Sequence, residues 1–154
     1  AEIKKEYPHK ITVNLAERIP IGTWCFQYKC YYFDDQGALW GKALRSSGSL
    51  LLIVEDNNES ISNPTKIEPG LLESIKKIVA GFDTINLGIK GIEIQASSIN
   101  DIRINTTKEY YILANTDSDI NKQLDILRIF LKNKGEDFHP TYIDIRIEGR
   151  VYYK

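Results

Sequence analysis

The 154-residue chain contains no methionine, only two cysteines and only two histidines. Its longest apolar run, residues 50–54, is far too short to span a membrane, and no signal peptide is recognisable. The net charge of −1 gives no bulk attraction to nucleic acid or to anionic lipid. Because the sequence starts at Ala1 and has no methionine, we expect it to be a piece of a longer protein.

Residues that carry chemistry are scarce and badly spaced for catalysis. His9 and His139 have no cysteine or acidic partner at metal-ligand spacing. Asn115, Asp117 and Asp119 imitate the first ligands of a calcium loop, but isoleucines occupy the later positions that need Gly and Glu. No nucleophile motif, phosphate-binding loop or dinucleotide fingerprint is present. The sequence therefore predicts no catalytic residue, no metal site and no cofactor, and a protein that is not an enzyme.

The spacing of apolar residues predicts the secondary structure. Apolar residues at every second position are typical of strands, and those three or four apart are typical of helices. One helix begins near Pro69, which suits a first helical turn, and a second follows the cap residue Asp119. Strands are expected at residues 10–17, 23–33, 38–40, 50–54, 89–95, 101–106, 108–115 and 142–154, with polar loops at 46–49 and 56–64. This order predicts an α+β fold: a mainly antiparallel β-sheet with two helices packed on one face and the C-terminal strand at a sheet edge.

The two cysteines, Cys25 and Cys30, lie in the aromatic segment 23–33, which we expect to form a hairpin around residues 26–29. They could face each other across that hairpin as a disulfide, which would imply an oxidising compartment. They could equally remain half-buried thiols, since free cysteine is often buried. Their spacing does not fit a Cys-x-x-Cys redox motif.

The last thirteen residues carry the clearest pattern. Ile143, Ile145 and Ile147 fall on one face of the expected strand, and polar residues alternate with them on the other. A strand that ends a chain often lies at a sheet edge, where its unpaired N–H and C=O groups can pair with another chain. This segment therefore indicates a binding protein. The alternative is that the strand is central, with strands on both sides.

Four short motifs occur in order along nearly the whole chain. They are Glu17-Arg18-Ile19-Pro20 at a strand end, Trp24 in the next strand, Asp34 with Gly37 in a hairpin turn, and Tyr142-Ile143-Asp144-Ile145-Arg146 in the last strand. In this order the segments resemble the extracytoplasmic part of the FtsQ/DivIB family of bacterial cell-division proteins. The tail from Gly149 to Lys154 is also similar to family endings, whereas the cysteine pair is not a family signature.

The resemblance implies two domains: residues 1–20 as the C-terminal remnant of a POTRA-like domain, and residues 21–154 as an FtsQ-type β domain. It implies a single transmembrane helix upstream and a location on the extracytoplasmic side of the bacterial cytoplasmic membrane. Family members are non-enzymatic divisome scaffolds. They bind FtsB/FtsL (DivIC)-type coiled-coil membrane proteins and help regulate septal wall synthesis.

In the family the last strand takes up the partner by strand addition. Carried over to this chain, the resemblance implies a partner-binding edge from residue 144 to residue 150, at Asp144, Arg146, Ile147, Glu148, Gly149 and Arg150.

Two other functions compete with the scaffold interpretation. An exported carbohydrate-binding module or enzyme could use the aromatic cluster between Trp24 and Phe33 to stack sugars. A membrane-anchored secretion or transport subunit could contain similar POTRA-like parts.

Overall fold

The computed structural model describes residues 2–15, 17–45, 51–58, 65–135 and 138–154. Within these residues the chain forms eleven strands and two α-helices. In chain order they are β1 (Glu2–Glu6), β2 (Lys10–Asn14), β3 (Gly22–Phe26), β4 (Lys29–Phe33), β5 (Leu39–Ala43), β6 (Leu52–Asp56), α1 (Pro69–Thr84), β7 (Ile89–Gln95), β8 (Ser98–Thr106), β9 (Tyr111–Asn115), α2 (Ile120–Lys132), β10 (Tyr142–Asp144) and β11 (Tyr152–Tyr153).

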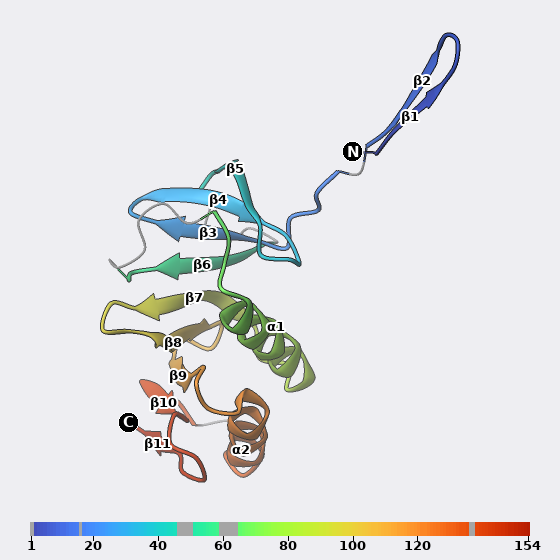
Figure 1. Cartoon of the computed structure of the whole chain (residues 1–154). Helices are drawn as coiled ribbons and strands as arrows, with labels where there is room; N and C mark the ends of the chain where they lie inside the picture. The colour runs from blue at the N-terminus through green and yellow to red at the C-terminus, as the bar shows by residue number, and fades with distance from the viewer. Residues whose placement is uncertain (1, 16, 46–50, 59–64, 136–137) are drawn as a thin grey trace.

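Nine of the strands form one sheet in the order β11-β10-β9-β8-β7-β6-β3-β4-β5, and both helices lie on the same side of it (Figure 1). Five of its eight strand pairings are antiparallel and three are parallel. The predicted α+β fold, with a mainly antiparallel sheet and two helices on one face, is confirmed. The last strand, β11, lies at an edge of the sheet, as predicted.

The two helices share a face for a topological reason. Helix α1 joins the parallel neighbours β6 and β7, and α2 joins the parallel neighbours β9 and β10. Strand β9 runs in the same direction as β7, because each is antiparallel to β8. Both connections therefore step toward β11 from strands of the same direction. A right-handed crossover then places each helix on the same face.

The core lies between the sheet and the helices, and the alternation of isoleucines builds it. Every second residue of β7 and β8 points to the helices, so that Ile92, Ile94, Ile102 and Ile104 are fully buried. Residues three or four apart on α1 face them, and its buried apolar residues are Leu71, Leu72, Ile75, Ile78 and Phe82. The isoleucines of β7 and β8 and the apolar residues of α1 therefore pack against each other in one sheet–helix interface.

Both helices begin where the sequence predicts. Pro69 opens α1, and the Glu68 carboxylate accepts hydrogen bonds from the amides of Gly70 (2.9 Å) and Leu71 (2.7 Å). Asp119 caps α2 by accepting from the Asn121 amide at 2.9 Å. Each cap satisfies N–H groups that have no partner inside the helix.

The prediction of one continuous strand from residue 142 to 154 is wrong. Strand β10 ends at Asp144, whose Oδ1 accepts from the Arg146 amide at 3.0 Å. The chain then turns, with Gly149 at φ 75° and a hydrogen bond from the Arg150 amide to the Ile147 carbonyl. Strand β11 therefore returns antiparallel to β10. Consequently β10 is an inner strand, and Ile147 is exposed in the turn although the alternation predicts it in the core.

The N-terminal residues form a separate two-stranded sheet, β1–β2 (Figure 1). Strand β2 was predicted, although it is shorter than expected, whereas β1 was not. Its pairing places Ile3 opposite Val13, and both are exposed, as are Ile11 and Leu15. A single hairpin is marginally stable in water. The assignment of residues 1–20 to a POTRA-like domain stays a prediction.

Two expectations in the middle of the chain are met only in part. The strand predicted at 50–54 is found two residues later, as β6. The loop predicted at 46–49, and most of the one at 56–64, lie outside the described residues.

Gly22 gives a test of the packing of β3. A Cβ added there would lie 2.5 Å from the Phe33 Cζ and 2.8 Å from the Leu52 carbonyl oxygen. Because Phe33 is fully buried and the Leu52 atom is backbone, neither neighbour can move cheaply. We expect Gly22→Ala to lower the free energy of unfolding by about 1–3 kcal/mol in urea denaturation, although alanine normally suits a strand better than glycine.

The matched control is Gly135→Ala, because nothing lies within 4 Å of a Cβ at that position. Equal stability of the two variants would contradict the packing described for β3.

Candidate partner-binding site

The residues predicted to bind a partner divide into two structural groups. Asp144 is the last residue of β10, Arg146 follows it two residues later, and both are half-buried. The Arg146 guanidinium donates to both Asp144 oxygens, at 3.0 and 2.7 Å, and lies 3.5 Å from an Asp101 oxygen on β8. These two side chains therefore bind each other and the sheet, and Arg146 is not a cation available on its own.

This ion pair sets the protonation of Asp144. Burial alone would raise the pKa of the Asp144 carboxyl, but hydrogen bonds from the Arg146 side chain and amide outweigh it and hold that pKa below its usual value. Asp144 therefore stays ionised in mild acid, and the pair holds the end of β10 in place.

The second group, residues 147–150, forms the exposed turn between β10 and β11. Glu148 pairs with Lys122 on α2 at 2.7 Å, and Arg150 donates to the Tyr152 hydroxyl at 3.3 Å. These surface contacts dock the turn beside the start of α2, although exposed ion pairs contribute little to stability. The turn is thus accessible, but it does not have the strand geometry that the sequence predicted.

The edge itself belongs to β11. Lys154 and Tyr142 exchange backbone hydrogen bonds, at 3.3 and 3.4 Å. In an antiparallel ladder such a pair alternates with a non-bonded pair, here Tyr153 opposite Ile143. The N–H and C=O of Tyr153 therefore point away from β10, to the side where no further strand lies among the described residues. The sequence prediction missed Tyr153, because it placed the edge earlier in the chain.

An aromatic cluster holds β11 against α2. We use the name aromatic cluster for Phe130, Phe138 and Tyr153, whose ring centroids lie 5.3–5.5 Å apart. The Lys134 ammonium lies 4.5 Å from the Tyr153 ring centroid and 5.0 Å from each of the other two. It also donates to the Tyr153 hydroxyl at 3.2 Å. The edge strand is thus fixed by one tyrosine that belongs to both the strand and the cluster.

The opposite edge of the sheet, β5, has a different character. Two of its residues, Gly41 and Lys42, oppose the single Tyr31 of β4, and Gly41 has φ 57°. A bulge and an edge lysine both hinder pairing with a further strand. The two edges therefore differ, and β11 is the one without a bulge.

The uncovered face of the sheet is occupied by side chains that satisfy one another. Asn105 donates to Glu93 at 2.6 Å and accepts from Arg103 at 3.1 Å. The Arg103 guanidinium lies 3.9 Å above the Tyr111 ring, which stacks on Tyr142. These contacts tie β7 to β10 on the side that carries no helix.

The motifs around Arg18 and Asp34 come together in space. Arg18 donates to Asp34 at 2.8 Å and lies over the Trp40 ring at 5.8 Å. Burial would raise the pKa of the Asp34 carboxyl, but hydrogen bonds from the Ala38 and Gln36 amides, together with Arg18, hold it below its usual value. This contact joins the segment after β2 to the turn between β4 and β5.

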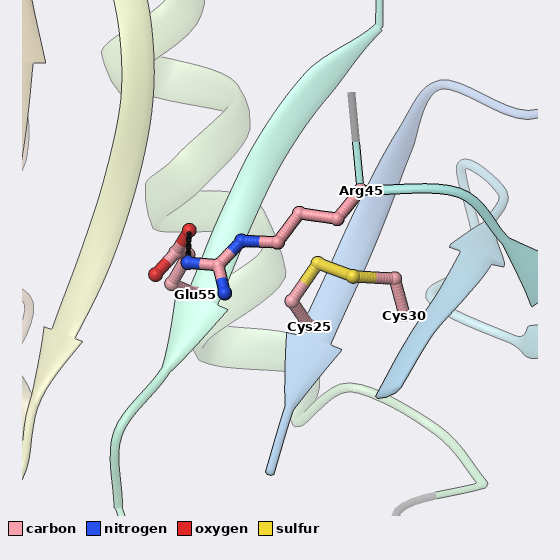
Figure 2. Close-up of a disulfide and its surroundings, with 4 residues drawn as sticks. All are labelled: Cys25, Cys30, Arg45 and Glu55. Carbon is pink, nitrogen blue, oxygen red and sulfur yellow. Dashed lines mark hydrogen bonds and ion pairs between the residues drawn. A yellow bond between two sulfur atoms is a disulfide. The ribbon is translucent and has the colours of Figure 1, made fainter. Parts of the chain in front are cut away.

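Cys25 and Cys30 form a disulfide across the β3–β4 hairpin, next to the ion pair of Arg45 with Glu55 (Figure 2). The two cysteines are directly opposite each other in the ladder. Three of the six aromatic side chains around them belong to the core: Trp24 and Phe26 are buried, and Phe33 is completely so. Only Tyr28, at the tip, is fully exposed among the aromatic residues of this hairpin.

Three further observations concern the described residues. No group of three or more His, Cys, Asp or Glu side chains in this part of the chain is placed to hold a metal ion. No helix there is both long enough and apolar enough to cross a membrane. No family model matches the sequence, and no curated protein matches it.

The ion pair of Arg146 with Asp144 gives a pH-dependent prediction. We expect Arg146→Gln to lower the free energy of unfolding at neutral pH by up to about 1 kcal/mol, since the pair is only partly buried. An aspartate whose pKa is lowered by folding contributes stability above its unfolded pKa of about 4. That contribution is lost as the pH falls through the folded pKa, so the two proteins should converge in acid.

Urea unfolding across a pH series measures this difference. Arg128→Gln is the control, because its pair with Asp125 is exposed on both sides. A difference for Arg146→Gln that persists in strong acid would contradict the assigned role.

The aromatic cluster predicts that Lys134 stabilises the edge strand. Lys134→Met keeps the aliphatic stem but removes the ammonium, which at such a site is worth about 1 kcal/mol. We expect the hydrogen exchange of the Lys154 amide, which donates to the Tyr142 carbonyl, to become about fivefold faster. Lys132→Met, at the exposed last residue of α2, should leave that rate unchanged, and equal rates in the two variants would contradict the prediction.

Proposed function

We propose that this chain is a non-enzymatic scaffold module of the bacterial divisome that binds FtsB/FtsL (DivIC)-type partners by β-strand addition at β11. The proposal continues the sequence resemblance to the FtsQ/DivIB family and moves the binding edge from residues 144–150 to β11 and the turn before it. Septal wall synthesis is the process in which we propose that the module acts.

One observation carries the proposal: the sheet ends at β11 with the Tyr153 N–H and C=O directed outward. Unpaired backbone groups at a sheet edge are a template for an additional strand. The other edge, β5, has a bulge at Gly41 and Lys42. Strand addition is therefore supported at one edge and disfavoured at the other.

Because β11 has only two residues, a partner must also contact side chains near it. Two strand residues offer few backbone hydrogen bonds, and most binding energy in interfaces comes from a few well-packed side chains. Tyr153 is half-exposed and lies against Phe130 and Phe138. A partner strand beside β11 would place its side chains next to this apolar surface, and the exposed Ile147 would extend it.

Two features support an extracytoplasmic location, which we propose for the module. The disulfide between Cys25 and Cys30 suits an oxidising compartment. The β1–β2 hairpin exposes apolar residues on its own small sheet, as expected if residues 1–20 complete a POTRA-like domain.

A pair of substitutions at Tyr153 tests the strand addition. Tyr153→Pro and Tyr153→Ala both remove the aromatic ring, but only proline removes the outward N–H. We expect Tyr153→Ala to weaken binding by about tenfold and Tyr153→Pro to weaken it by about a further tenfold or more, equivalent to 1.4 kcal/mol per tenfold. Calorimetry with the periplasmic coiled-coil segments of FtsB/FtsL-type proteins from the same genome measures both.

The circular dichroism spectra of the two variants should match each other, because both lose the ring, and the hydrogen bonds between the end of the chain and β10 use the backbone of Tyr142 and Lys154. Equal affinities of the alanine and proline variants would show that the outward N–H of Tyr153 takes no part. Binding that neither substitution changes would contradict the β11 edge.

A further inference from the structure

A pocket of about 160 Å³ is lined by the β8–β9 turn, the C-terminal end of α2 and the loop that leads to β10. Cavities of about 150 Å³ hold a molecule the size of benzene, so this pocket has room for one side chain. Two kinds of residue line it. The aromatic or apolar ones are Tyr110, Leu131 and Phe138, and the basic ones are Lys108, Lys134 and His139.

The protein does not neutralise the basic side chains of this pocket. Among the described residues none of them forms an ion pair, and none of the residues that line the pocket is acidic. Lys134 donates to the Tyr153 hydroxyl at 3.2 Å, but an ammonium group has further N–H donors. A negatively charged group in the pocket would therefore meet lysine ammonium groups without a competing carboxylate.

Tyr110 adds a neutral donor to the pocket. The residue is 8% exposed, and its hydroxyl has no hydrogen-bond partner among the described residues, although the protein does not enclose it completely. Burial raises the pKa of this hydroxyl, which therefore stays protonated and able to donate. Gly135, which also lines the pocket, has an N–H without a partner in the same part of the chain. The lining thus offers unpaired donors, which call for a ligand that accepts hydrogen bonds.

The apolar lining indicates that the accepting group is attached to an apolar one. Leu131 and Phe138 are half-buried and face the pocket with part of their surface. The last residue of a peptide carries a carboxylate and a side chain on the same Cα atom, so it can satisfy the donors and cover this surface together. Such a ligand also leaves the pocket in one direction only, which suits a site lined by three segments of the chain.

We propose that this pocket binds the C-terminal residue of a peptide that has a free carboxylate and an apolar side chain such as leucine. The carboxylate accepts hydrogen bonds from the Tyr110 hydroxyl and the Lys108 ammonium, and the side chain packs on Leu131 and Phe138. Because Phe138 and Lys134 also contact Tyr153, the pocket adjoins β11. Its ligand is nevertheless a chain end and not an added strand.

The test compares acetylated tripeptides. They are Gly-Gly-Leu with a free carboxylate, the same peptide with a terminal amide, and Gly-Glu-Gly with a terminal amide. The second keeps the leucine without the charge, and the third keeps a carboxylate away from the chain end. In ¹⁵N-resolved spectra of the whole chain, we expect the first peptide to shift the amides of Lys108, Tyr110 and Gly135 in a saturable way. Each of the other two should bind about tenfold more weakly.

Two variants locate the site. Lys108→Gln and Tyr110→Phe should each raise the Kd of the free-carboxylate peptide by about fivefold to tenfold. Both are expected to fold, because Lys108 is exposed and the Tyr110 hydroxyl has no partner among the described residues to lose. The matched controls are Lys42→Gln on β5 and Tyr7→Phe in the β1–β2 hairpin, which should leave the Kd unchanged.

Absence of saturable shifts with the free-carboxylate peptide, or equal affinity for its amide, would overturn the proposal. Tighter binding of the glutamate peptide at the same amides would overturn it in favour of a site for acidic side chains. A Kd that neither Lys108→Gln nor Tyr110→Phe changes would also contradict it, because the peptide would then bind elsewhere. Strand addition at β11 is tested by the Tyr153 variants and not by these peptides.

Discussion

Both helices are crossover connections between parallel neighbours, and the handedness of such connections determines what the rest of the molecule exposes. Since β6–α1–β7 and β9–α2–β10 step in the same direction, both helices cover one face and leave the other without a helix. The second crossover also sets β10 parallel to β9. The chain that follows β10 can then only add on its outer side, which is how β11 becomes the edge.

The parts of this fold that depend on neighbouring residues could be predicted from the sequence. The helix start at Pro69, the cap at Asp119 and the alternation in β7 and β8 all depend on local spacing, and the structure confirms each. The prediction of a continuous terminal strand was wrong because the alternation of apolar residues runs to Ile147, whereas the extended backbone of β10 ends at Asp144. The Asp144 carboxylate takes the Arg146 amide, and Gly149 adopts a left-handed conformation. Alternation says which residues suit a strand, but not where the backbone turns.

Contacts between distant segments left almost no signal in the sequence. In the sequence Arg18 and Asp34 belong to separate motifs, and their ion pair depends on how the segment after β2 folds against the β4–β5 turn. The aromatic cluster is a similar case, since Phe130, Phe138 and Tyr153 come from a helix, a loop and a strand. Gly149 is a residue that suits a turn, but the similarity of residues 149–154 to family endings favours a continuous strand.

The described residues leave unsatisfied groups at very few places, and this distribution indicates where the molecule can bind. On the uncovered face Arg103 and Asn105 already have partners within the sheet, as does Arg146, so a ligand there would have to displace existing hydrogen bonds. At β11 the outward backbone groups of Tyr153 have no strand to pair with among the described residues. Forming a new hydrogen bond to such a group costs less desolvation than replacing one that exists. Backbone pairing at the β11 end of the sheet is therefore the mode of recognition that displaces the fewest existing hydrogen bonds.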